Sequence, residues 1–247
     1  SDLNIEQAIK LIRGEKGTEV LLTIYRNGAK KPLEIKIVRD VINTPTIEVE
    51  LNKDGIFVVS LYSFSANSAS LFRDAMKKFV DSGSDKLLLD LRGNPGGYLE
   101  ASIDMASWFL SPGKTVVIED YGNNIKQKIF RSHGYDIFND KLKFVILMDN
   151  GSASASEILA GAMQDHKIAK LVGTKSYGKG SVQEVIDVTP DTIFKITVAK
   201  WLTPLGRSIS EKGLDPDYKV EVTEKDIETK NDPQMAKALE LLKNWSE

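Results

Sequence analysis

The first 40 residues alternate apolar and polar positions in two different ways. Residues 4–13 repeat apolar side chains at helical spacing, which predicts an amphipathic helix. Two β-branched runs follow at 20–25 and 33–38, and the turn signal Asn27-Gly28 lies between them. The pattern therefore predicts a small unit made of one helix and one β-hairpin.

From residue 46 onward the pattern predicts a larger α/β core. Strand-like runs at 46–52 and 55–60 precede an amphipathic helix near 66–82, whose expected core residues are Leu71, Ala75, Met76, Phe79 and Val80. Two nearly continuous apolar runs, 86–91 and 144–148, are typical of strands buried on both faces. Helices are expected after these runs, near 98–110 and 153–166, and a tail helix is expected at 232–244.

The boundary between the two units is expected in a polar segment at 40–46. Asp40, Asn43 and Pro45 interrupt both the strand and the helix patterns there. We therefore predict domains at 1–41 and 42–247. The second is long enough to bury a substantial core.

Composition narrows the classes of function. The 247 residues carry a formal net charge of −2, and no stripe of Lys and Arg interleaved with aromatics is present, which argues against nucleic acid as a partner. With no cysteine, the chain has neither a thiolate metal site nor a cysteine nucleophile. No apolar run approaches the length of about 18–20 residues that spans a bilayer.

Two turns that leave apolar strands carry candidate chemistry. The Gly96-Gly97 pair opens one predicted helix and can expose backbone N–H groups to an oxyanion. Ser154 falls in the first turn of the helix near 153–166, where N–H groups lack intrahelical partners. We expect Ser154 as nucleophile, with the N–H of Ala155 and one from Gly96 or Gly97 forming an oxyanion hole.

A serine nucleophile needs a base, and Lys179 is the expected one. The chain contains only two histidines, whereas Lys179 lies between Gly178 and Gly180, which allow the backbone to turn the side chain into a closed pocket. Burial favours the uncharged amine of a lysine. An arginine could not serve as the base, because its side chain stays protonated. The sequence thus predicts a buried Lys179 amine.

Plainer interpretations exist for each signal. Ser154 and Glu157 also match a capping box, and Ser152 or Ser156 could equally be the reactive serine. The Gly96-Gly97 pair could form only a tight strand-to-helix turn. The conjunction of these signals, not any one alone, favours catalysis.

Two other types of site compete with the serine–lysine pair. A Ser-His-Asp triad would have to use His133 or His166, which instead match a polar loop and a helix end. Residues 173–179 match the G-x-x-x-x-G-K part of a phosphate-binding loop. However, Gly180 stands where a Ser or Thr is needed, and 181–188 alternates like a strand where a helix should begin. We therefore reject the phosphate-loop interpretation.

Nearly the whole chain resembles the C-terminal processing peptidases, or tail-specific proteases. The resemblance is carried, in order and at similar spacing, by four segments: 90–97 (DLRGNPGG), 151–158 (GSASASEI), 178–183 (GKGSVQ) and 203–209 (TPLGRSI). It implies an α/β fold with a mixed-sheet, crotonase/ClpP-like protease core, an N-terminal partial PDZ domain and a small flanking region rich in β and α elements.

The resemblance also implies roles for single residues. Ser154 would be the nucleophile, Lys179 the general base and Gln183 the residue that orients the lysine. Gly96, Gly97 and Ala155 would supply the oxyanion hole. The reaction would be peptide-bond hydrolysis through an acyl-enzyme, with no metal or organic cofactor.

By the same resemblance, residues 1–41 are the back part of a PDZ domain. The front part, which binds a peptide carboxylate, is absent from this chain, so we expect it to be a piece of a longer protein. Arg13 resembles a PDZ arginine that reaches the catalytic residues when substrate is bound. We therefore expect PDZ gating of the active site.

The expected partner is an unstructured polypeptide or one with an exposed C-terminus, and a homo-oligomer is an open possibility. A periplasmic or other extracytoplasmic location follows from the resemblance. The alternative is a protein of the same fold that binds a peptide or apolar ligand without chemistry. Against it, none of the catalytic positions is replaced.

Overall fold

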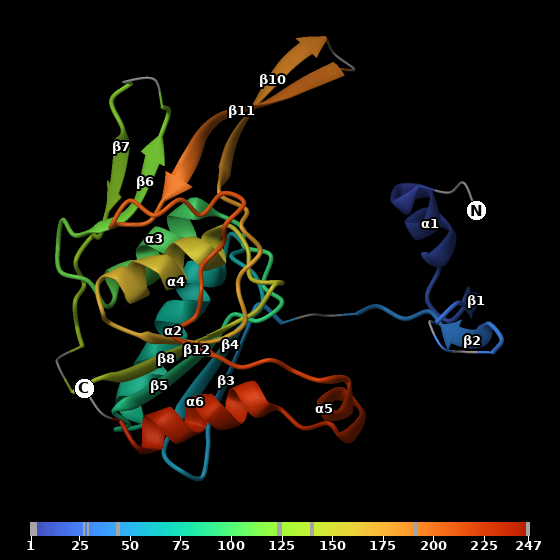
Figure 1. Cartoon of the computed structure of the whole chain (residues 1–247), viewed down its shortest axis with the longest axis horizontal. Coiled ribbons are helices and arrows are strands. Elements are labelled where there is room, and N and C mark those ends of the chain that lie inside the picture. Colours follow the sequence, from blue (N-terminus) through green and yellow to red (C-terminus); the bar gives the residue numbers. More distant parts are fainter. Residues whose placement is uncertain are drawn as a thin grey trace. The chain divides into compact units, whose positions relative to one another are not determined.

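The computed structural model describes residues 4–26, 28, 30–42, 45–122, 125–138, 141–189 and 192–245. The chain divides into two compact units, Ser1–Thr44 and Pro45–Glu247 (Figure 1). Of the predicted features, Asn27 of the hairpin turn and Asn43 of the boundary segment lie outside the described residues.

The first unit is the predicted helix and hairpin. Helix α1 (Ile5–Ile12) is capped by the Asn4 side chain, and strands β1 (Glu19–Ile24) and β2 (Leu33–Val38) pair antiparallel. Arg39 fastens the helix to the hairpin, because its guanidinium donates to Ile12 O and to Thr18 Oγ1. None of the described residues of this unit is buried, so it has no core of its own.

The second unit is built around a mixed sheet with the strand order β12-β9-β8-β5-β4-β3. Only the pairing of β3 with β4 is antiparallel, and the other neighbours are parallel. The strands are β3 (Ile47–Leu51), β4 (Phe57–Leu61), β5 (Lys86–Asp90), β8 (Lys143–Met148), β9 (Lys170–Gly173) and β12 (Tyr218–Lys219).

Helices cover both faces of this sheet (Figure 1). The alternation within β5 shows why: Leu87 and Leu89 join a cluster with three helices, while Leu88 joins a second cluster with the C-terminal helix. The three helices are α2 (Ser68–Asp81), α3 (Leu99–Ser107) and α4 (Ala155–Asp165), and the C-terminal helix is α6 (Pro233–Lys243), which follows the short α5 (Glu224–Thr229).

A partly buried arginine ties the C-terminal helix to the sheet. Arg92 lies just after β5, and its guanidinium contacts Asp90 at 2.7 Å and Asp232, the N-cap of α6, at 2.9 Å. Burial alone would lower the pKa of Arg92, but the hydrogen bond and charge of Asp90, with help from Asp232, raise the pKa above its usual range. The arginine therefore stays charged and holds the helix in place.

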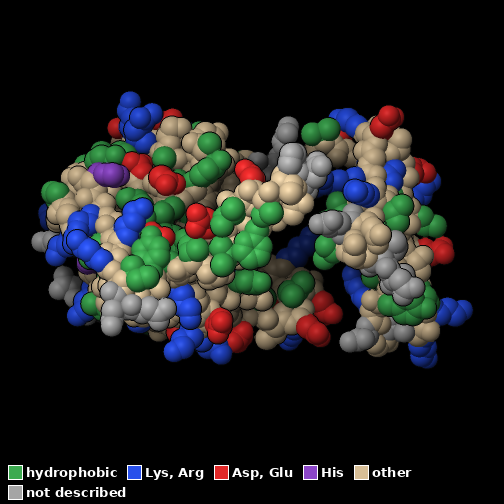
Figure 2. Space-filling view, turned by 90° about the horizontal axis from the view of Figure 1, so that it is seen from above, with side chains coloured by type: hydrophobic (Ala, Val, Ile, Leu, Met, Phe, Trp, Pro, Cys, Tyr) green, Lys and Arg blue, Asp and Glu red, His purple; other side chains and the backbone are tan. Residues whose placement is uncertain are grey.

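A second, antiparallel sheet has the order β10-β11-β6-β7. Its strands are β6 (Thr115–Asp120), β7 (Lys128–Arg131), β10 (Ser181–Thr189) and β11 (Thr192–Leu202). The β10–β11 hairpin projects from the core (Figure 1). Figure 2, seen from that side, shows hydrophobic side chains on the surface, and the hairpin exposes Val185, Ile186, Val188, Ile193, Phe194 and Ile196.

The sequence predictions are largely confirmed for the α/β core, with local corrections. The predicted helices and strands are present, with ends that differ by a few residues. Val80 was expected in the core but is 55% exposed, because it lies off the stripe that buries Phe72, Met76 and Phe79. Strands β6 and β12 were not predicted, and β12 has only two residues, a length that carries little periodicity.

Candidate active site

Three turns of the core meet at one edge of the mixed sheet. They follow the carboxyl ends of β5, β8 and β9, which are adjacent strands, and they carry Gly96-Gly97, Ser154 and Lys179. This edge is where open α/β sheets place their ligand sites. The parallel topology therefore gathers the three predicted segments in one region.

Ser154 lies at the junction between the turn after β8 and α4. It is the N-cap of α4 and has φ 57° and ψ −114°, a backbone conformation that a residue with a Cβ adopts only under strain. Its N–H donates to Glu157 Oε2 at 2.8 Å. The strained turn places its side chain at the mouth of a helix N-terminus.

The structure distinguishes between the three serines of the segment. Ser152 is buried, and its hydroxyl donates to Leu91 O at 2.8 Å. Ser156 is also buried, and its hydroxyl donates to Asn94 O at 3.0 Å. Only Ser154 of the three is partly exposed. Ser152 and Ser156 therefore hold the turns together, and Ser154 is left as the candidate nucleophile.

The glycine turn packs directly against Ser154. A Cβ added to Gly96, which has φ +94°, would lie 2.5 Å from Ala153 O and 2.9 Å from Ala155 N. The Gly96 N–H is already donated to Asn94 Oδ1 at 2.9 Å, whereas among the described residues the N–H groups of Gly97 and Ala155 have no acceptor. Gly96 thus provides close approach, and Gly97 provides a free amide.

We predict that Gly96→Ala lowers stability. The new methyl group meets backbone atoms at both ends of the Ser154 peptide, and φ is positive, so the free energy of unfolding should fall by about 2 kcal/mol. Urea denaturation measures the change. Gly93→Ala is the matched control, because Gly93 also has positive φ but has open space around its Cβ position, and its smaller loss isolates the effect of the clash.

A buried carboxylate joins the serine turn to the lysine turn. Glu157 is fully buried, and its Oε2 accepts from the N–H of Ser154 at 2.8 Å and from the N–H of Lys179 at 3.0 Å. Its Oε1 accepts from the N–H of Gly178 at 2.7 Å and from the Ser176 hydroxyl. Four donors thus bind one buried carboxyl group, as burial of a polar group requires.

The Lys179 side chain differs from the sequence expectation. We predicted a buried amine, but the side chain is exposed, and that prediction is wrong for this structure. Within the described part of the chain, no hydrogen bond joins Lys179 Nζ to the Ser154 hydroxyl. The backbone of Lys179 is fixed beside Ser154 through Glu157, while its side chain is free to turn.

Gln183 lies four residues further along, near the start of β10, and is also exposed. A break in the β10–β11 register falls between Val182 and Gln183, where Val198 is the extra residue on β11. Such bulges bend a strand and redirect its side chains. The bulge lies near the start of β10, next to Gln183, and so affects the direction of the Gln183 side chain.

The competing types of site are not supported. The segment after Lys179 forms strand β10, so residues 173–179 do not run into the helix that a phosphate loop needs. His166 caps the far end of α4 from Ser154, and its Nε2 bonds Thr115 O at 2.7 Å. His133 lies in the segment after β7, with its N–H on Ser107 Oγ at the end of α3. The histidines therefore do not pair with Ser154.

Arg13 belongs to the first unit. It is the C-cap residue of α1, is exposed, and donates its backbone N–H to Ile9 O at 2.9 Å. Among the described residues its side chain has no hydrogen-bond partner. The predicted link between Arg13 and the active site stays a prediction.

Neither a metal cluster nor a membrane helix is found in the described ranges. No group of three or more His, Cys, Asp or Glu side chains is arranged to hold a metal ion there. No helix in the same ranges is long and apolar enough to cross a bilayer.

Sequence reasoning missed the residues that fix the turns. Glu157 was noticed only as part of a capping box, and its contacts with residues 176–179 come from a distant segment. Asn94 and Asp149 bridge the two turns, with Ala153 N–H on Asn94 O and Gly93 N–H on Asp149 Oδ1. The available sequence signal was a polar residue close to the glycines in each turn, Asn94 in one and Asp149 in the other.

The layered α/β fold and a strained serine beside free backbone amides are typical of serine hydrolases. The chain belongs to peptidase family S41, whose family model matches residues 55–220.

The sequence is also similar to several proteins that are named as proteases. A probable CtpA-like serine protease of Staphylococcus haemolyticus is 40% identical, over 87% of this chain and 43% of that protein. The carboxy-terminal processing protease CtpA of Bacillus subtilis is 35% identical, over 89% of this chain and 46% of that protein. The structure of the photosystem II D1 C-terminal processing protease matches with a TM-score of 0.70 and 26% identity, over 84% of this chain and 57% of that one. The chain thus spans about half the length of the curated relatives it matches.

Proposed function

We propose that this chain is the catalytic part of a serine endopeptidase that cleaves polypeptides near their C-termini. Ser154 is the nucleophile, Lys179 the general base and Gln183 the residue that orients the lysine. One observation carries the proposal: a single carboxylate oxygen of Glu157 accepts from the backbone N–H groups of both Ser154 and Lys179. The serine and the lysine are thereby held within one small site.

The proposed reaction is acyl transfer to Ser154. The Ser154 oxygen attacks the peptide carbonyl while its proton passes to Lys179 Nζ, and the oxyanion accepts hydrogen bonds from the free N–H groups of Gly97 and Ala155. Collapse of this intermediate breaks the C–N bond, and Lys179 returns the proton to the leaving amine. Water then attacks the ester and gives a proton to Lys179. Lys179 returns a proton to the Ser154 oxygen as the ester C–O bond breaks, which releases the new carboxyl group and restores the serine.

This reaction requires a rearrangement of the Lys179 side chain. The exposed amine must reach the Ser154 hydroxyl and lose its contact with water, because burial favours the uncharged form of a lysine. In the proposal, the amide oxygen of Gln183 accepts a hydrogen bond from the amine and directs it. The described arrangement is thus a resting form, and substrate binding completes the site.

The first unit is proposed as the regulatory part. We assign residues 1–41 to the back part of a PDZ domain and 42–247 to the protease core, close to the observed division at Thr44 and Pro45. The lack of any buried residue in the described part of this unit supports the assignment, since its apolar side chains need a covering partner. Arg13 would transmit substrate binding to Lys179.

The proposed substrate is an unstructured polypeptide with an accessible C-terminus, processed in an extracytoplasmic compartment. The names of the matched relatives, which include a carboxy-terminal processing protease and a CtpA-like serine protease, support this substrate class. The absence of cysteine is compatible with an extracytoplasmic compartment but does not by itself identify one.

Digestion of casein tests the assignment of the base. Lys179→Ala should lower the rate at least about 100-fold, the contribution of a general base, while Lys175→Ala should leave it unchanged. Lys175 is the matched control, because it lies in the same turn and, among the described residues, its side chain forms only an exposed ion pair with Asp215 at 3.6 Å. Equal rates for wild type and both variants would remove Lys179 from the mechanism. A wild-type chain that binds casein without cleaving it would favour the alternative of a binding protein.

A further inference from the structure

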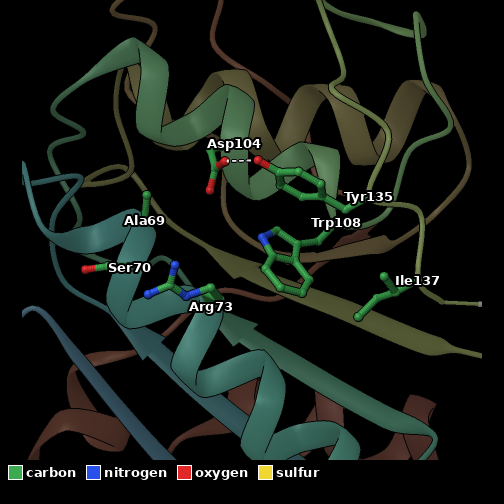
Figure 3. Close-up of a pocket in the computed structure, with 7 residues that line it drawn as sticks. All are labelled: Ala69, Ser70, Arg73, Asp104, Trp108, Tyr135 and Ile137. Carbon is green, nitrogen blue, oxygen red and sulfur yellow. Dashed lines mark hydrogen bonds between the residues drawn. The ribbon is translucent and has the colours of Figure 1, made fainter.

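A cavity between α2 and α3 lies apart from the proposed active site. Its volume is about 640 Å³, and its walls include Arg73, Asp104, Trp108, Tyr135 and Ile137 (Figure 3). Helix α3 begins two residues after Gly97, and Asp104 and Trp108 lie about 8 Å and about 14 Å further along it at 1.5 Å per residue. We refer to this space as the α2–α3 cavity.

Opposite charges face this cavity without contacting each other. Arg73 comes from α2 and Asp104 from α3, and no ion pair joins them in the described part of the chain. The charged neighbour of Arg73 is Asp74, at 3.9 Å, in an exposed pair that contributes little. The Arg73 side chain is 65% exposed and lines the cavity, so it keeps donors that are available to a ligand there.

One of the two carboxylate oxygens of Asp104 accepts a hydrogen bond. Its Oδ1 accepts the Tyr135 hydroxyl at 2.7 Å, and this bond raises the pKa of Tyr135 above its usual value, as a neighbouring ionised carboxylate does. Its Oδ2 has no partner among the described residues. One acceptor is therefore available opposite the cationic side of the cavity.

The remaining walls are aromatic and apolar. The rings of Trp108 and Tyr135 pack edge to face with centroids 5.4 Å apart, and Ile137 lies beside Trp108 in Figure 3. The Trp108 Nε1 is buried and has no hydrogen-bond partner in the described ranges. An unmade bond of this kind costs about 1–3 kcal/mol, which favours a ring shift when an acceptor enters the cavity.

We propose that the α2–α3 cavity binds the C-terminal residue of a polypeptide that ends in an aromatic or large apolar side chain. The free carboxylate bonds Arg73, the amide N–H of the same residue bonds Asp104 Oδ2, and the side chain packs on Trp108 and Ile137. A C-terminal residue places an anion, a donor and a side chain around one Cα, which matches the three kinds of wall. The site is independent of the chemistry at Ser154.

Calorimetric titration of the 247-residue chain carrying Ser154→Ala tests the proposal without cleavage. The probes are acetyl-Ala-Ala-Phe with a free carboxylate and the same peptide as its C-terminal amide. The free acid should bind at least about tenfold more tightly, the ratio expected for loss of a charge-assisted hydrogen bond. In a proton–nitrogen NMR spectrum, the Trp108 indole signal should shift, and that of the buried Trp201 should not.

Two charge variants on α2 locate the binding. Arg73→Gln should abolish the preference for the free acid, and Lys78→Gln, an equal loss of charge on another side of the same helix, should preserve it. Both side chains are exposed, so both variants should fold. Equal affinity for acid and amide, no saturable binding of either peptide, or an acid preference that survives Arg73→Gln would each overturn the proposal.

Discussion

Ser154→Ala should abolish peptide-bond cleavage, with a fall in kcat of at least about 10,000-fold. The hydroxyl is the atom that becomes acylated in the proposed mechanism, and the free N–H groups of Gly97 and Ala155 cannot replace it. Stability should fall by only about 1 kcal/mol, because the hydroxyl is lost as a cap for the Glu157 N–H, while the Ser154 backbone N–H remains on Glu157. Mass spectrometry of casein digests measures the activity, and urea denaturation measures the stability.

Ser156→Ala is the matched control for this prediction. Ser156 lies two residues after Ser154, in the first turn of α4. Its buried hydroxyl bonds Asn94 O, so its loss should lower the free energy of unfolding by about 1 kcal/mol and leave most of the activity. The opposite pattern, in which Ser156→Ala is inactive and Ser154→Ala cleaves casein normally, would transfer the nucleophile to Ser156 and contradict the mechanism.

Glu157→Gln should cause the largest loss of stability of the changes considered. A glutamine keeps the shape but offers one acceptor oxygen, so its NH₂ group must face two of the four donors that now bind the carboxylate. Loss of two hydrogen bonds to a charged group should lower the free energy of unfolding by about 3–5 kcal/mol. For a domain of this size, the melting temperature should fall by roughly 6–20 °C.

Activity should fall further in Glu157→Gln than unfolding alone explains, since the shared anchor of Ser154 and Lys179 is broken. The rate is therefore compared at a temperature where the variant is fully folded by circular dichroism. Glu100→Gln is the control, because Glu100 is exposed in the first turn of α3 and should change stability by less than about 0.5 kcal/mol. A folded Glu157→Gln protein with full activity would show that the shared anchor has no catalytic role.

The hydrophobic pattern predicted the elements that form the core because those elements are long and buried. Strands β5 and β8 have almost no exposed residue, and helices α2 and α4 each span at least three turns. The edge strands β7 and β12 are short and half exposed, so their sequence carries little signal. Periodicity therefore succeeds where burial dictates the residue types.

The candidate site was predictable in its segments but not in its contacts. The glycines and serines of the turns mark where each strand ends, and the topology explains why these segments meet. By contrast, the exposure of Lys179 depends on three-dimensional neighbours that no local pattern encodes. Glu157 is the clearest case, because a capping-box signature conceals a bond to residues more than 20 positions away.

The anchoring of Lys179 through its backbone N–H has a consequence for how fast such an enzyme can switch on. In the proposed mechanism, the main chain is already fastened to Glu157, so the amine approaches the serine by rotations about side-chain bonds. Such rotations take picoseconds to nanoseconds in exposed residues. Activation then has no slow loop-refolding step of its own, and its timing is set by whatever partner or substrate arrives to enclose the lysine.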